Sequence, residues 1–178
     1  IERSIAEQLT WACAKLILER LPINNGTPIP EELKNLSFNL AETYYANMSI
    51  FRSAPDTWSI AQLFPIMPIH RLNEKPTQLG DFADLTCDSD GKITKFINNG
   101  KVKPLLELHK LRPNENYMIG MFLGGAYQEG MGNLHNLFGS TNAAHIRITD
   151  EGKYKVEHVV RGDTKADVLQ SMEHNPEV

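Results

Sequence analysis

Apolar residues in the first part of the chain recur at the spacing of one helical face. Between residues 2 and 21 they return every three or four positions, which predicts an amphipathic helix. Pro22 and the segment 24–26 end it. Pro30 followed by two glutamates is typical of a first helical turn, so residues 30–44 predict a second helix. The apolar positions are Ile5, Leu9, Ala12, Cys13, Leu16, Ile17 and Leu21 in the first helix, and Leu33, Leu36, Leu40 and Tyr44 in the second.

These two helices predict a helical hairpin over residues 1–46. A pair this short has little core of its own, so we expect it to complete a bundle with helices outside this chain. Cys13 falls on the apolar face and is expected to pack there as a small apolar side chain rather than to react.

From about residue 47 the pattern changes to short extended segments separated by turns. Pro65 and Pro68 indicate an edge strand, and the apolar run 117–123 indicates a buried strand stopped by glycine. Asp163 or Thr164 is expected to cap a C-terminal helix that runs to about Met172. The segments with the pattern of strands are 49–53, 63–71, 82–85, 93–97, 105–111, 117–123, 146–149 and 154–160.

The predicted fold class is therefore α+β. The helical hairpin of residues 1–46 is followed, in residues 47–178, by a mainly antiparallel β barrel or sandwich with a closing helix. This division predicts two parts of the chain with different architecture.

One predicted turn carries reactive side chains. Cys87, Asp88 and Asp90 lie within four residues, between a strand that ends near Leu85 and one that begins near Ile93. Two close carboxylates attract a cation, and a neighbouring thiol can supply a proton or a nucleophile. The alternative is ordinary turn chemistry, because Asp, Ser and Gly favour turns and a single Cys is usually a small apolar residue.

A second motif, Gly125-Ala126-Tyr127, follows the apolar run 117–123. Glycine there lets backbone N–H groups approach an anion, and a tyrosine hydroxyl can donate to a phosphate oxygen. The alternative is a loop glycine beside a half-buried tyrosine.

Composition narrows the classes of function. The net charge of −4 and the absence of a Lys/Arg stripe give no reason to expect nucleic acid, and no apolar run is long enough to span a bilayer. The two cysteines are far apart, so no pairing is implied and a reducing compartment is expected. The chain opens with Ile1 inside a helical pattern, from which we expect it to be part of a longer polypeptide.

The two motifs together resemble the pyridoxal-phosphate decarboxylases of basic amino acids, the group of alanine-racemase-like fold that acts on ornithine, diaminopimelate and arginine. Longer segments resemble the biosynthetic arginine decarboxylases of the cyanobacterial and plant branch, and the resemblance covers nearly the whole chain. These segments are 47–51, 53–58, 62–66, 68–72, 85–91, 120–129 and 135–139.

The resemblance implies an active site shared with a TIM-like barrel that carries the cofactor lysine and lies outside this chain, so the chain alone is expected to be inactive. Cys87 would protonate the substrate Cα after carbon dioxide leaves. Asp88, and with less support Asp90, would bind the guanidinium of L-arginine. Tyr127 would bind the phosphate of pyridoxal 5'-phosphate, with Gly125 and Ala126 setting the approach.

The resemblance further implies a homo-oligomer with active sites between subunits, formation of agmatine for polyamine synthesis, and a cytoplasmic location, or a plastid in a plant or alga. Mg²⁺ is implied as well, although no carboxylate cluster in the sequence is assigned to it. Gln62, His70, His135 and Asn136 receive no role. Two alternatives stay open at this point: a non-catalytic dimerisation or regulatory module, and an enzyme of the same group that acts on ornithine or diaminopimelate.

Overall fold

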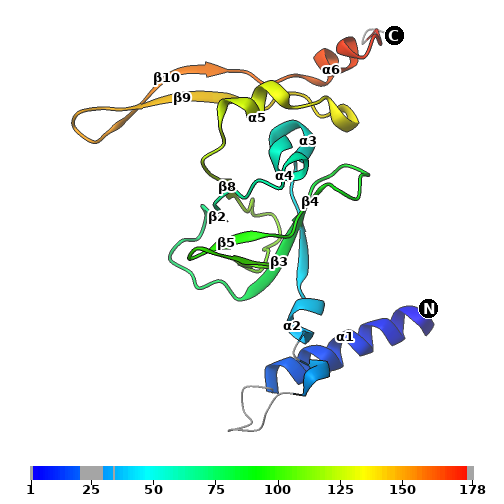
Figure 1. Cartoon of the computed structure of the whole chain (residues 1–178). Helices are drawn as coiled ribbons and strands as arrows, with labels where there is room; N and C mark the ends of the chain where they lie inside the picture. The colour runs from blue at the N-terminus through cyan, green and yellow to red at the C-terminus, as the bar shows by residue number, and fades with distance from the viewer. Residues whose placement is uncertain (1, 21–29, 34, 176–178) are drawn as a thin grey trace. The chain divides into compact units, whose positions relative to one another are not determined.

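The computed structural model describes residues 2–20, 30–33 and 35–175, and these form two compact units (Figure 1). The first unit comprises Ile1–Tyr44, Pro65–Phe82 and Ile93–Phe122, and the second comprises Tyr45–Phe64, Ala83–Lys92 and Leu123–Val178. The predicted division at residues 46 and 47 stays a prediction.

Apart from the 19-residue helix α1, the described helices and strands are short, and strands β2 to β8 follow one another without a helix between them. The helices are α1 (Glu2–Arg20), η2 (Glu31–Leu33), α2 (Leu36–Asn39), α3 (Ile50–Ser53), α4 (Pro55–Ser59), α5 (Ala126–Met131), η3 (His135–Leu137) and α6 (Lys165–Ser171). The strands are β1 (Glu42–Tyr45), β2 (Ile66–Pro68), β3 (Gln78–Ala83), β4 (Lys92–Ile93), β5 (Phe96–Asn98), β6 (Lys101–Lys103), β7 (Leu106–Leu108), β8 (Ile119–Met121), β9 (Ala143–Ile148) and β10 (Tyr154–Val160).

The first unit is built around a small aromatic core. Strand β3 pairs with β7 in an antiparallel register, and β3 also lies between β1 and β4. The ring of Phe82 contacts the rings of Tyr44 and Phe96, with centroids 6.4 and 5.9 Å apart. Phe96 and Leu108 are fully buried, so this core fixes the strands on which the unit depends.

The second unit packs α3 and α4 against α5. Ile50 and Phe51 of α3 are buried. The Arg52 guanidinium donates a hydrogen bond to the carbonyl of Gly132 (2.9 Å) and another to the Ser140 hydroxyl. Arg52 therefore ties the segment after α5 to α3, while the β9–β10 hairpin extends as a two-stranded ribbon (Figure 1).

Several predictions are confirmed. The chain has the α+β class, with an N-terminal helix, antiparallel sheets and a C-terminal helix, and its described strands form four separate sheets in which no closed barrel is seen. The hairpin around residues 150–152 is present as β9 and β10. Thr164 rather than Asp163 caps α6, because its hydroxyl accepts from the Asp167 N–H while the Asp167 carboxylate bonds back to Thr164.

Other predictions are wrong. The segment 49–53, predicted as a strand, forms helix α3 over Ile50–Ser53, with Ser49 as its cap. The second predicted helix is reduced to η2 and α2, and Tyr44 lies in β1. The run 117–123 is not a buried strand, since β8 covers only Ile119–Met121 and is half-buried. None of the residues of α1 is buried, and Cys13 is exposed rather than packed.

Candidate functional site

A buried carboxylate organises the loop that joins β3 to β4. Asp84 is only 3% exposed. Its Oδ2 accepts a hydrogen bond from the N–H of Ile50 (2.8 Å), and its Oδ1 accepts from the N–H and hydroxyl of Thr86 (2.9 and 2.7 Å). The carboxylate thus closes the first turn of the loop and also satisfies an N–H at the start of α3.

The last residue of this loop, Gly91, has no room for a side chain. A Cβ at Gly91 would lie 2.2 Å from Oδ1 of Asp84. The Asp84 N–H donates to the Gly91 carbonyl at 2.8 Å, so the two ends of the loop are joined directly. The loop 84–91 is therefore closed by its own hydrogen bonds.

The three predicted reactive residues lie on this loop and are accessible. Cys87 and Asp90 are exposed and Asp88 is half-buried. Oδ1 of Asp88 accepts from the Asp90 N–H at 2.9 Å. Asp88 is thus the residue that caps the turn, whereas the Asp90 carboxylate makes no hydrogen bond within the described residues. The ordinary turn chemistry considered for this stretch is therefore provided by Asp88.

The segment η3 lies against this loop. Nδ2 of Asn136 is 3.5 Å from Sγ of Cys87, within reach of a hydrogen bond to sulfur. Nε2 of His135 is 3.9 Å from Oδ2 of Asp88, and its ring stacks on Phe51 with centroids 4.1 Å apart. His135 and Asn136 had no assigned role from the sequence. Their position within the resembling segment 135–139 was the signal that could have found them.

Gly125, Ala126 and Tyr127 form the start of helix α5. Gly125 is the residue before the first turn, and a Cβ there would meet nothing within 4 Å. Tyr127 is 76% exposed, so it is not the half-buried loop tyrosine of the alternative interpretation. Its hydroxyl has no partner within the described ranges. The Gln128 N–H donates to the Gly125 carbonyl at 3.1 Å. Among the described residues, the segment therefore offers the N–H groups of Ala126 and Tyr127 and the tyrosine hydroxyl on an open surface.

The described contacts of Gln62 and His70 are made with other residues. Gln62 is exposed and its side chain donates to the neighbouring Leu63 carbonyl. His70 belongs to the first unit, where its Nε2 is 3.8 Å from the Glu115 carboxylate and its buried Nδ1 has no hydrogen-bond partner.

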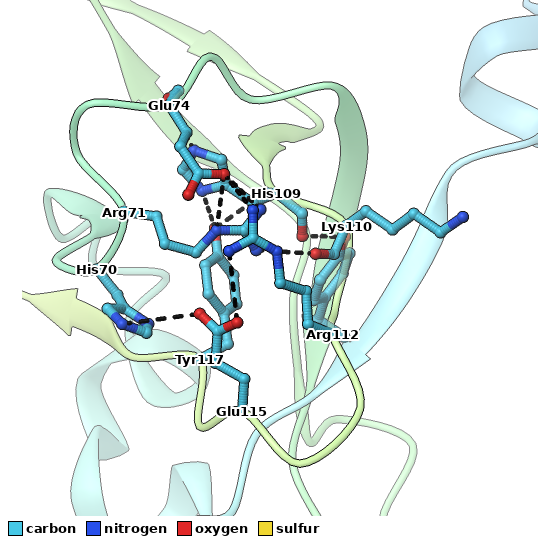
Figure 2. A network of polar contacts seen from close by, with 9 residues as sticks. His70, Arg71, Glu74, His109, Lys110, Arg112, Glu115 and Tyr117 are labelled. Atoms are coloured by element: carbon cyan, nitrogen blue, oxygen red, sulfur yellow. Dashed lines mark hydrogen bonds and ion pairs between the residues drawn. The ribbon is translucent and has the colours of Figure 1, made fainter.

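A network of polar side chains in the first unit surrounds Glu74 (Figure 2). The Glu74 carboxylate accepts from the guanidinium groups of Arg71 and Arg112, both at 2.7 Å. The bond from Arg71 holds the pKa of Glu74 below its ordinary value. The buried His109 contacts the Tyr117 hydroxyl at 2.7 Å and the Glu74 carbonyl at 2.9 Å. Because these groups satisfy one another, the network joins the loop after β2 to the loop after β7.

The described residues contain neither a metal-binding cluster nor a membrane-spanning helix. In residues 2–20, 30–33 and 35–175, no group of three or more His, Cys, Asp or Glu side chains has the arrangement of a metal site. No helix in the same ranges has both the length and the apolar character needed to cross a membrane.

No family model matches the sequence. The biosynthetic arginine decarboxylase of a Prochlorococcus marinus strain is 71% identical over 176 residues, which is 99% of this chain and 27% of that protein. The protein of the same name from a Nostoc species is 57% identical over 99% of this chain and 26% of its own length. The chain thus spans about a quarter of the length of these curated relatives.

A solved structure agrees with the sequence comparison. The crystal structure of the biosynthetic arginine decarboxylase from Campylobacter jejuni matches 91% of this chain and 29% of its own length, with a TM-score of 0.63 and 36% identity. By sequence and by fold, the chain is therefore similar to a part of the biosynthetic arginine decarboxylases, about a quarter of their length.

Proposed function

We propose that this chain is the part of an arginine decarboxylase that supplies a proton donor, a carboxylate for the substrate and a phosphate contact to an active site completed by the rest of the enzyme. The observation that carries the proposal is the loop 84–91. It holds a thiol and carboxylates at an accessible position through the buried Asp84, in a chain whose relatives are named arginine decarboxylases.

Cys87 is the proposed proton donor. The reaction replaces the bond between Cα and the carboxylate with a Cα–H bond, so a proton must reach Cα after carbon dioxide leaves. An exposed thiol on a loop that is closed by hydrogen bonds can be held at a fixed distance from a substrate. The thiolate left behind regains its proton from water.

The carboxylates of Asp88 and Asp90 are proposed to bind the guanidinium of L-arginine. A guanidinium donates in a planar, bidentate geometry that a carboxylate matches. One oxygen of Asp88 is engaged by the Asp90 N–H, whereas both oxygens of Asp90 are free of other described side chains. The other oxygen of Asp88 lies 3.9 Å from Nε2 of His135, so the unengaged oxygens at this turn are the two of Asp90.

The start of α5 fits the phosphate of pyridoxal 5'-phosphate. The open surface at Gly125, the N–H groups of Ala126 and Tyr127 and the hydroxyl of Tyr127 form a donor set suited to an anion. When bound, this cofactor withdraws the electrons released as the carboxylate leaves. Gly125, Ala126 and Tyr127 would hold its phosphate, and the chain would not hold its aldehyde carbon.

The active site would be completed by the remaining part of the enzyme, in a homo-oligomer with sites between subunits, and the product would be agmatine for polyamine synthesis. Mg²⁺ is implied by resemblance, but the described residues offer no cluster of ligands for it. The cytoplasm, or a plastid in a plant or alga, is the proposed location.

The test is a substrate comparison on the full-length protein that contains this chain, saturated with pyridoxal 5'-phosphate. We expect agmatine from L-arginine, and at least a hundredfold lower kcat/KM for L-ornithine, because the shorter side chain leaves the carboxylates unpaired. A preference for ornithine or diaminopimelate would assign the chain to a sister enzyme. No turnover of any of the three would favour the non-catalytic module.

A further inference from the structure

The sulfur of Cys87 has one described polar neighbour, the side-chain amide of Asn136. Nδ2 lies 3.5 Å from Sγ and can donate to it, and Oδ1 lies 3.9 Å from Sγ and can accept from the thiol. We propose that Asn136 is a positioning residue for Cys87: it donates to the sulfur and fixes the direction of the thiol during proton delivery. This proposal rests on the proposed function of Cys87 and adds a residue to it.

The backbone at Asn136 is unusual in a way that brings the amide to the sulfur. Asn136 has φ 53° and ψ 39°, and Leu137 follows with φ 62°. Left-handed backbone is costly for most L-residues, but Asn is among the few that tolerate it. Two successive left-handed residues turn the chain sharply between His135 and Phe138, which places the side chain of Asn136 at the loop that carries Cys87.

The same segment is held in place by its neighbours. The His135 ring stacks on Phe51, which is 5% exposed, and its Nε2 faces the Asp88 carboxylate. The Phe138 N–H donates to the His135 carbonyl at 3.3 Å. Asn136 is therefore presented from an anchored segment, so its amide can restrict the thiol rather than follow it.

The amide of Asn136 would act on the thiolate that Cys87 becomes after it gives up its proton. When Cys87 gives its proton to Cα, the S–H bond breaks, and the electron pair left by carbon dioxide forms the new Cα–H bond. The sulfur then carries a negative charge until water returns a proton. An N–H donor at the sulfur stabilises that charge, so Asn136 would speed transfer of the proton from Cys87 to Cα. Fewer turnovers would then release carbon dioxide without forming agmatine.

Two substitutions distinguish the effect of the Asn136 side-chain amide from that of the left-handed backbone. Asn136→Asp keeps the shape and the tolerance of left-handed backbone but removes the N–H donor. Asn136→Gly keeps the backbone conformation and removes the side chain. Asn133→Asp is the matched control, because Asn133 is an exposed residue three positions earlier whose side chain makes no described contact. It adds the same charge to the same segment.

Two readouts on the full-length enzyme test the proposal. The first is the rate of alkylation of Cys87 by iodoacetamide at pH 7.5, followed by peptide mass spectrometry, with the exposed Cys13 as internal reference. Because the thiolate is the reacting form, loss of the donor is expected to slow Cys87 about tenfold in Asn136→Asp and severalfold in Asn136→Gly, with Cys13 unchanged. The second is the ratio of carbon dioxide to agmatine, which is expected to rise in both variants and to stay at the wild-type value in Asn133→Asp.

Unchanged alkylation of Cys87 in both Asn136 variants would overturn the proposal, and so would slower alkylation with a wild-type product ratio. Cys87→Ala, measured in parallel, separates this failure from that of the proposed function. If Cys87→Ala changes the ratio and the Asn136 variants do not, Asn136 has no positioning role while Cys87 keeps its own. If Cys87→Ala also leaves the ratio of carbon dioxide to agmatine unchanged, Cys87 is not the proton donor. Asn136 then has no positioning role in the reaction either.

Discussion

The carboxylate of Asp84 accepts a hydrogen bond from the backbone N–H of Ile50, 34 residues earlier in the chain, at 2.8 Å. The same carboxylate accepts from the N–H and hydroxyl of Thr86. One buried side chain therefore fixes both the start of α3 and the loop that carries Cys87. The position of the loop depends on this buried carboxylate.

Asp84→Asn is expected to loosen this loop. The amide keeps one acceptor oxygen but turns a donor toward groups that are themselves donors, at a cost of about 1.5–3 kcal/mol. Amide hydrogen exchange in peptide 84–91 of the full-length enzyme should become at least about tenfold faster. Asp150→Asn, at an exposed hairpin turn, is the control and should leave that peptide unchanged. Equal exchange in wild type and Asp84→Asn would contradict the organising role of Asp84.

Gly91→Ala tests the same carboxylate from the other end of the loop. The new methyl group would lie 2.2 Å from Oδ1 of Asp84, so either the loop or the carboxylate must move. We expect a lower melting temperature and the same faster exchange in residues 84–91. Gly130→Ala is the matched control, because a Cβ there meets nothing within 4 Å and alanine favours a helix. A Gly91→Ala enzyme as stable as wild type would rule out the close approach.

Tyr127→Phe should weaken binding of pyridoxal 5'-phosphate. One hydrogen bond to a charged group contributes about 1.5–3 kcal/mol, which predicts a Kd raised by roughly 10-fold to 150-fold. Equilibrium dialysis of the full-length apoenzyme measures it. Tyr154→Phe removes a hydroxyl of similar exposure, 74% against 76%, and should leave the Kd unchanged. Equal affinity of the two variants for pyridoxal 5'-phosphate would show that the Tyr127 hydroxyl does not bind the cofactor.

Glu74→Gln should lower the protection of the loop after β2 in a pH-dependent way. The folded-state pKa of Glu74 is lowered by its bond to Arg71, so its stabilising effect is present above its ordinary value of 4.5 and is lost as the pH falls through the folded-state value. Hydrogen exchange in peptide 71–78 should differ between variant and wild type at pH 7, and the difference should shrink below pH 4.5. Glu151→Gln, which breaks an ion pair with 73% and 78% exposed side chains, should show no such trend. A difference independent of pH would contradict the ionic role of Glu74.

Local patterns in the sequence identified the elements whose stabilising contacts are also local. The β9–β10 hairpin follows from alternating residues around a turn that contains Gly152, and α6 follows from the cap of Thr164. The turn at Cys87 was found for the same reason, because Asp88 and Gly91 close it within a few residues.

Elements that depend on distant residues were missed. The stretch 49–53 has apolar residues suited to a strand. The Asp84 carboxylate and the Ser49 hydroxyl accept from the N–H groups of Ile50 and Arg52, which the first turn of a helix leaves without backbone partners. Tyr44 fitted a helical face by its spacing. It lies in β1, where its hydroxyl reaches the His109 carbonyl at 3.1 Å, 65 residues away. Spacing along the chain carries no information on such partners.

In the candidate site, too, the sequence identified residues that lie in local motifs and missed a contact between distant residues. Cys87, Asp88 and Tyr127 were singled out by motif, whereas the contact of Asn136 with Cys87 spans 49 residues and rests on a left-handed backbone at Asn136. Asn is common in loops, so its residue type alone gave no reason to join it to the thiol.

Cys87 is proposed to deliver the proton that completes formation of agmatine. The ratio of carbon dioxide released to agmatine formed by Cys87→Ala in the full-length enzyme tests this role. The wild type should give a ratio of about one, since each correct protonation yields one amine. Cys87→Ala should turn over more slowly and give a ratio clearly above one, with the affinity for pyridoxal 5'-phosphate kept. Wild-type turnover and a ratio of one in Cys87→Ala would contradict the account.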